Sequence, residues 1–123
     1  MGHGDELVLA DGNFPAASVA QRLVRLDGHD IPEILEAVLK FFPLDTYVES
    51  PAGLMKVVPG DNYQPVIWET YRKIIQESKE PFNDFGYIER FEFYERAKKA
   101  YAVLATSESA LYANIILKKG VVV

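Results

Sequence analysis

The two histidines are the side chains best suited to proton transfer without a cofactor, because imidazole titrates near neutral pH. His3 stands just before an apolar segment, where it is either an acid–base catalyst or an idle terminal residue. His29 lies between Gly28 and Asp30 in a predicted turn, and we expect it on the surface. His3 is therefore the first candidate for acid–base chemistry.

Polar side chains also follow two predicted buried strands. Asp11 and Asn13 come after the first, and the turn at residues 106–108 follows the second and leads to Tyr112-Ala113-Asn114. Ligands of open α/β sheets bind in the crevice beyond the carboxyl ends of the strands. Both polar groups are therefore expected to face one crevice that carries few charges.

Other candidates have an alternative structural role. Arg90 could bind a polar ligand, or it could pair with Glu89 or Glu92 on the surface. Three aromatic side chains could stack on a sugar ring, but their helical or strand context favours core packing: Trp68, Tyr47 and Tyr71.

Several kinds of site lack support. The chain has no cysteine, which removes thiolate nucleophiles, zinc-thiolate sites and iron–sulfur clusters. Strand alternation sends neighbouring side chains to opposite faces, so we expect no metal site among His3, Asp5, Glu6 and Asp11. No glycine-rich phosphate loop is present, and neither Ser18 nor Ser107 lies in a Gly-x-Ser-x-Gly elbow.

The composition suits one globular domain over residues 1–123, with 49% hydrophobic residues. The net charge of -5 and the scattered basic residues argue against nucleic-acid and membrane partners. No apolar run approaches the roughly 20 residues of a membrane span. Asp5 and Glu6 replace the positive charge of a signal peptide, so we expect a cytoplasmic protein.

The apolar pattern predicts strands that alternate with helices, and therefore an α/β layered sheet. Strands are expected at residues 7–10, 54–58, 87–90, 101–106 and 114–117. Helices are expected after Pro15, from a capping box at Asp30 and Glu33 to Phe42, from Pro65 onward, and at 93–99, with a polar loop at 78–86.

Five blocks of the chain, taken in order, resemble the L-fucose mutarotase family. They are Met-Gly-His-Gly-Asp-Glu from Met1, residues 10–16, Pro-Leu-Asp-Thr-Tyr at 43–47, Arg-Phe-Glu-Phe-Tyr-Glu-Arg at 90–96, and residues 112–120. The related D-ribose pyranases share the Gly-His, Asp and Tyr-Ala-Asn elements. The 90–96 block favours the fucose branch.

The resemblance implies a three-layer α/β/α subunit with a mixed sheet, assembled into a ring-shaped homo-oligomer, usually a decamer, with active sites near subunit contacts. It implies no cofactor. It assigns His3 as proton donor, Asp11 and Arg90 as ligands of sugar hydroxyls, and Tyr112, Ala113 and Asn114 to the rest of the sugar site, with Tyr112 also catalytic. The expected reaction interconverts the α and β anomers of L-fucose. The alternatives are a ribose-type pyranase and a non-catalytic sugar-binding regulatory subunit.

The chain departs from the family pattern in two places. Members carry a helical segment before Met-Gly-His, so we expect that segment to be missing here. Ser107 stands where the family has glycine, and it would be strained if its turn required a positive φ. Ala113, often glycine in the fucose branch, is a minor change.

Overall fold

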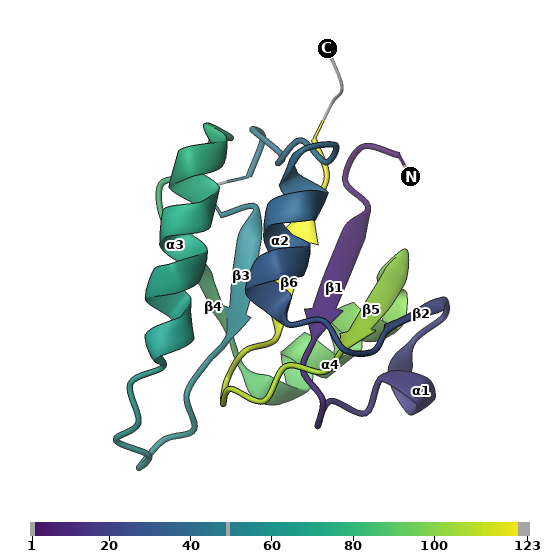
Figure 1. Cartoon of the computed structure of the whole chain (residues 1–123), viewed down its shortest axis with the longest axis vertical. Helices are drawn as coiled ribbons and strands as arrows, with labels where there is room; N and C mark the ends of the chain where they lie inside the picture. Colours follow the sequence, from purple (N-terminus) through teal and green to yellow (C-terminus); the bar gives the residue numbers. More distant parts are fainter. Residues whose placement is uncertain (1, 49, 121–123) are drawn as a thin grey trace.

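The computed structural model describes residues 2–48 and 50–120 (Figure 1), so Met1 of the opening motif lies outside the described residues. These residues form a six-stranded sheet in the order β2-β5-β1-β6-β3-β4. The strands are β1 Glu6–Ala10, β2 Leu23–Leu26, β3 Ala52–Met55, β4 Gly86–Ile88, β5 Ala102–Thr106 and β6 Ile115–Lys118. β6 runs antiparallel to both its neighbours and the other pairs are parallel, so the sheet is mixed, as expected.

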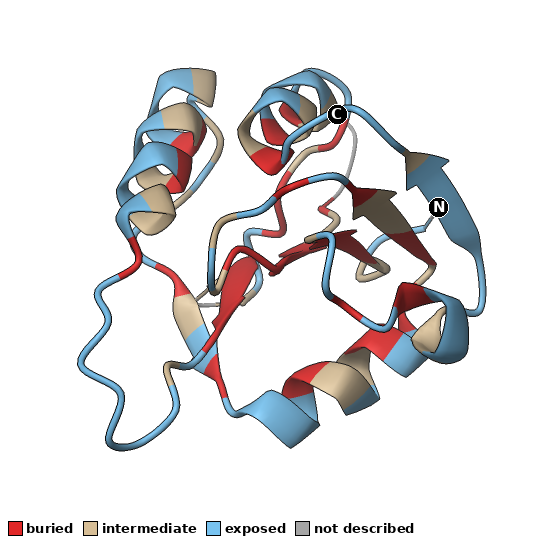
Figure 2. Ribbon diagram, turned by 60° about the horizontal axis from the view of Figure 1, so that its bottom comes forward, coloured by how far each residue is buried: buried red, intermediate tan, exposed pale blue. Residues whose placement is uncertain are grey.

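Four helices cover the two faces of this sheet: α1 Ala16–Val19, α2 Ile31–Leu39, α3 Val66–Ser78 and α4 Arg90–Lys99. Successive β1 side chains point to opposite faces. Leu7 and Leu9 join the core under α2 and α3, whereas Val8 and Ala10 join the core under α1 and α4. Figure 2 shows the buried part of the sheet between the two layers of helices. The predicted three-layer α/β/α architecture is confirmed. Within the described part of the chain, every helix is too short or too polar to span a bilayer.

Side-chain caps set the starts of α2 and α4. The Asp30 carboxylate accepts a hydrogen bond from the Glu33 amide at 3.2 Å, which is one half of the predicted capping box, whereas the Glu33 carboxylate lies against the His29 ring. The Glu89 carboxylate accepts hydrogen bonds from the amides of Phe91 and Glu92. Arg90 is therefore the first residue of α4, and our placement of it at the end of a strand was wrong.

Two strands differ from the prediction. β2 was missed, because Leu23 and Val24 are exposed on a sheet edge and show no alternation between core and solvent. β3 lies at 52–55 instead of 54–58. Gly53 packs so closely on Ile88 that an added Cβ would lie 2.5 Å from its side chain, so tertiary packing decides this strand against the weak strand propensity of glycine.

Candidate active site

The carboxyl ends of β1, β3 and β4 lie along one edge of the sheet, next to the start of the antiparallel strand β6. A cavity of about 360 Å³ opens at this edge. Its polar lining consists of Asp11, Asn13, Asp61, Arg90, Tyr94, Tyr112 and Asn114. Apolar side chains, including Phe14, Met55 and Leu111, supply the rest. The structure thus brings together most of the residues that the resemblance assigned to the sugar site.

Asp11 is fixed at the end of β1 by hydrogen bonds on both sides. Its amide donates to Asn114 Oδ1 at 2.7 Å, and its carboxylate accepts from the Asn13 amide at 3.0 Å. Burial raises the pKa of the Asp11 carboxyl, and the nearby charge of Glu108 acts in the same direction, while the Asn13 and Phe14 amides oppose the shift. Folding therefore disfavours the ionised form of this carboxyl group.

An Asp11→Asn variant is expected to unfold at a higher temperature than the wild type at pH 7. The pKa in the folded state lies above the ordinary value of 3.8, so folding disfavours the ionised group. The wild type therefore loses stability as the pH rises from 3.8 through the folded-state pKa of Asp11. Asparagine does not ionise, so the variant avoids this loss. Thermal unfolding across pH 3 to 8 checks the prediction; the gain should vanish below about pH 3.8, and an equal gain at every pH would contradict it.

Tyr112 has a left-handed backbone, with φ of 56°. Two side chains from α3 hold the backbone there: Trp68 Nε1 donates to the Tyr112 carbonyl at 2.8 Å, and the Tyr71 hydroxyl donates to the Ala113 carbonyl at 2.6 Å. Non-glycine residues in this conformation persist where their surroundings enforce it, and they cluster at functional sites. Tyr71 is fully buried, as predicted, and Trp68 is half-buried. Ala113 is also fully buried.

Arg90 and Tyr94 form a pair across one turn of α4. Arg90 Nε donates to the Tyr94 hydroxyl at 3.4 Å, and this contact raises the pKa of the guanidinium. Among the described residues Arg90 forms no ion pair, so the alternative of pairing with Glu89 or Glu92 is wrong. Sequence reasoning missed Tyr94 as a pocket residue, although its spacing of four from Arg90 places both on one helix face.

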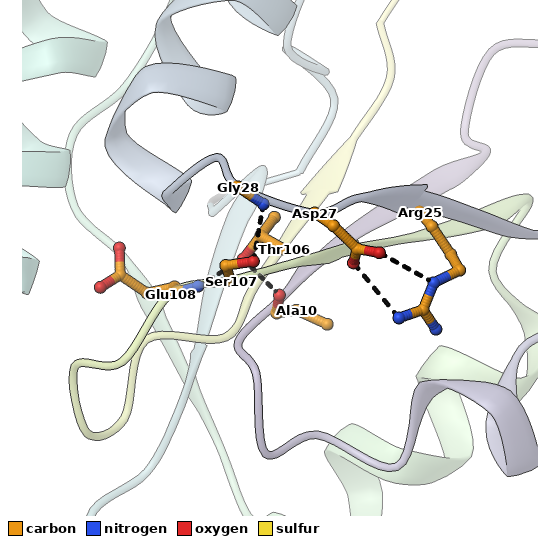
Figure 3. Close-up of polar contacts among 7 residues, drawn as sticks. All are labelled: Ala10, Arg25, Asp27, Gly28, Thr106, Ser107 and Glu108. Atoms are coloured by element: carbon orange, nitrogen blue, oxygen red, sulfur yellow. Dashed lines mark hydrogen bonds and ion pairs between the residues drawn. The ribbon is translucent and has the colours of Figure 1, made fainter.

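The turn after β5 is hydrogen-bonded to the end of β1, next to Asp11 (Figure 3). The Thr106 hydroxyl donates to the Ala10 carbonyl at 2.8 Å and accepts from the Glu108 amide. Thr106 and Glu108 are buried and do not line the cavity around Tyr112. Thr106 does line, together with Asp11, a second cavity of about 300 Å³, so the expectation that this turn faces the crevice holds for Thr106 only. The Ser107 hydroxyl accepts a hydrogen bond from the Gly28 amide at 2.8 Å. The φ of Ser107 is not positive, so serine in place of the family's glycine causes no backbone strain in this turn.

His3 and Asp11 lie at opposite ends of β1, since His3 precedes this strand and Asp11 follows it. Its Nε2 is 3.2 Å from Asp45 Oδ1, and its ring contacts Tyr47 edge-on at 5.3 Å between centroids. Two hydrogen bonds lower the pKa of the buried Asp45 carboxyl. The bond from the Tyr47 amide has the larger effect and the bond with His3 the smaller one. The five-residue strand β1, roughly 17 Å long, separates the two residues. A single chain therefore does not bring His3 to the pocket.

Tyr47 and His29 both lie on the surface. Tyr47 is 78% exposed, so our assignment of it to the core was wrong. The Asp45 carboxylate accepts from the Tyr47 amide and turns the chain there, outside any strand. His29 is exposed, as predicted, and its Nδ1 lies 2.7 Å from a Glu33 oxygen. In residues 2–48 and 50–120, no three acidic or histidine side chains gather as metal ligands would.

Known proteins share this chain's sequence and fold. The chain is 57% identical to the fucose mutarotase of Mus musculus over 126 residues, 98% of this chain and 82% of the mouse protein. It is 47% identical to the L-fucose mutarotase of Actinobacillus pleuropneumoniae serotype 5b (strain L20) over 121 residues, 98% of this chain and 84% of that protein. The resemblance inferred from the five blocks is confirmed.

Solved structures agree with this result. The crystal structure of the fucose mutarotase from Streptococcus pneumoniae in complex with L-fucose matches all of this chain and 87% of that chain, with a TM-score of 0.94 and 56% identity. Bacillus subtilis RbsD complexed with D-ribose matches all of this chain and 87% of that chain with a TM-score of 0.71 at 21% identity, and it shows the fold alone. The sequence model of one family also matches residues 1–122. On this evidence the chain belongs to the RbsD / FucU transport protein family.

Proposed function

We propose that this chain is a mutarotase that interconverts the α and β anomers of L-fucose. Its similarity to named fucose mutarotases supports the reaction and the sugar. The observation that carries the proposal is the pocket itself, in which Asp11, Arg90, Tyr94, Tyr112 and Asn114 surround one cavity. A carboxylate, a guanidinium, an amide and two phenols can donate to and accept from the hydroxyls of a neutral sugar.

The reaction needs two proton transfers. The anomeric hydroxyl loses its proton and the ring oxygen gains one, so the ring opens to a planar carbonyl and recloses on either face. General acid–base catalysis of such steps contributes roughly 10²- to 10⁴-fold each. In the proposed site His3 is the proton donor, Tyr112 takes part in proton transfer, and Asp11, Arg90 and Asn114 bind the sugar. Ala113, whose side chain is fully buried, belongs to this site through its backbone. We propose that no cofactor takes part.

His3 lies too far from the pocket of its own chain to act there, so a second subunit would have to supply this side chain. We propose a cytoplasmic homo-oligomer, a ring and specifically a decamer, in which the His3 and Asp45 pair of one subunit completes the pocket of a neighbour. Its support is the position of the pair at the edge of the sheet opposite Asp11. Head-to-tail contacts between unlike surfaces form a ring when the rotation between neighbours closes, and in a closed ring every subunit has the same completed site.

Mixing two inactive variants tests this assembly. His3→Ala and Asp11→Ala preparations should each lack exchange activity, because each removes one half of every site. After unfolding together and refolding, random assembly should restore roughly a quarter of the wild-type rate, since that share of sites combines two intact halves. Exchange NMR on L-fucose gives the rate. A mixture that forms oligomers but stays inactive would place His3 and Asp11 of one chain in the same site.

The experiment that tests the reaction is exchange NMR on L-fucose at anomeric equilibrium, with D-ribose in parallel. Acceleration on L-fucose is the expected result. Faster pyranose–furanose exchange on D-ribose than on L-fucose would assign the chain to the pyranase alternative. Sugar binding without exchange on either sugar would support the regulatory alternative instead.

A further inference from the structure

The segment between β3 and α3 extends beyond the carboxyl edge of the sheet (Figure 1) and brings one more carboxylate to the pocket. Asp61 Oδ2 accepts a hydrogen bond from the Tyr112 hydroxyl at 2.8 Å. Asp61 Oδ1 accepts from the Tyr63 amide at 2.9 Å, and the Asp61 amide donates to the Val58 carbonyl at 3.0 Å. Asp61 thus has a defined place in a turn. The Tyr63 ring also stacks on the Tyr112 ring, with centroids 6.1 Å apart.

These contacts determine the direction of the hydrogen bonds at Tyr112. An ionised carboxylate can only accept, so the phenolic proton of Tyr112 points toward Asp61. The Val58 amide, 3.3 Å from the Tyr112 oxygen, occupies a second position around that oxygen. The remaining lone pair can therefore accept a proton from a ligand. The Tyr94 hydroxyl is arranged in the opposite sense, because it accepts from Arg90 and keeps its own proton for donation.

We propose that Asp61 is a positioning residue that makes Tyr112 the proton acceptor of the reaction. The inference rests on the proposed function and identifies the base of that site. The anomeric O–H bond breaks as its proton passes to the Tyr112 oxygen, and the phenolic proton moves to the Asp61 carboxylate. The electron pair left on the anomeric oxygen forms the carbonyl. The bond from the anomeric carbon to the ring oxygen breaks, and the ring oxygen takes the proton of His3. Reclosure returns both protons.

Asparagine at position 61 separates this role from a structural one. Asp61→Asn keeps the size of the side chain and an oxygen that can accept hydrogen bonds from Tyr63 and Tyr112, but an amide oxygen is too weakly basic to take the phenolic proton. We expect at least a roughly tenfold lower L-fucose exchange rate with an unchanged dissociation constant for the sugar. Asp61→Glu should recover part of the rate, because it restores a carboxylate. Glu77→Gln, an exposed position on α3, removes the same charge and should leave the rate unchanged.

The Tyr112→Phe background decides whether Asp61 acts through Tyr112. If it does, Tyr112→Phe is impaired and adding Asp61→Asn lowers its rate no further. An equal loss in both backgrounds would mean that Asp61 acts on the sugar directly and would overturn the inference. Wild-type exchange in Asp61→Asn or in Tyr112→Phe would also overturn it, while leaving the mutarotase function intact. Absence of L-fucose exchange in the wild type would overturn the proposed function and this inference together.

Discussion

A His3→Ala variant is expected to lose roughly 10²- to 10⁴-fold of the L-fucose exchange rate while it remains folded. The imidazole is half-exposed and contacts Asp45 and Tyr47, so its removal leaves no cavity in the sheet. Asp45 keeps the hydrogen bond from the Tyr47 amide. Exchange NMR gives the rate, and sugar titration should show that much of the binding is retained, because the groups that hold the hydroxyls are unchanged.

His29→Ala is the matched control for this experiment. His29 is similarly exposed and also lies beside a carboxylate, that of Glu33, so the substitution removes the same ring and a comparable contact. It lies outside the pocket, and we expect a rate close to that of the wild type. A His3→Ala variant as active as His29→Ala would remove His3 from the mechanism and make the Tyr94 hydroxyl, which lines the pocket, the candidate proton donor.

A Glu108→Ala variant is expected to lower the free energy of unfolding by about 2–5 kcal/mol, because it leaves backbone amides without partners. The buried carboxylate accepts from the Ile31 amide at 3.1 Å, at the start of α2, and from the Ser109 and Ala110 amides, also at 3.1 Å. Ile31 is fully buried, so water does not readily replace this acceptor. The loss would be a large share of the roughly 5–15 kcal/mol typical of a domain.

Urea unfolding measures the effect, with Glu33→Gln as control. Glu33 lies in the same first turn of α2, but its side chain is exposed and its carboxylate pairs with the surface residue His29. We expect a change below about 1 kcal/mol for this control. A loss of the same small size for Glu108→Ala would show that the three amides find other partners, and that the turn from Ser107 to Ala110 does not depend on this carboxylate.

Local signals predicted several parts of the fold correctly. The cap at Asp30 and the strand at residues 7–10 depend on neighbours within a few residues, and the structure contains both. Tyr71 was placed in the core by helical periodicity, and it is fully buried. The hydrogen bond that Tyr71 makes to the Ala113 carbonyl was not foreseen, because the two residues are 42 positions apart in the chain.

Sequence reasoning and the family resemblance identified Asp11, Arg90, Tyr112 and Asn114, and the structure places all four around one cavity. Tyr94 was missed, although its helical spacing from Arg90 was visible. Asp61 carried no local signal, since Pro59-Gly60 beside it predicted only the end of a strand.

The sequence by itself determined the alternation of strands and helices, the helix cap at Asp30 and the kinds of side chain available for sugar chemistry. These features arise from contacts between residues a few positions apart. The tertiary structure alone decided the strand order, the edge position of β2, the exposure of Tyr47 and the separation of His3 from Asp11. Each of these depends on which distant strands pair, and in which direction, and the local pattern of a strand does not encode its neighbour.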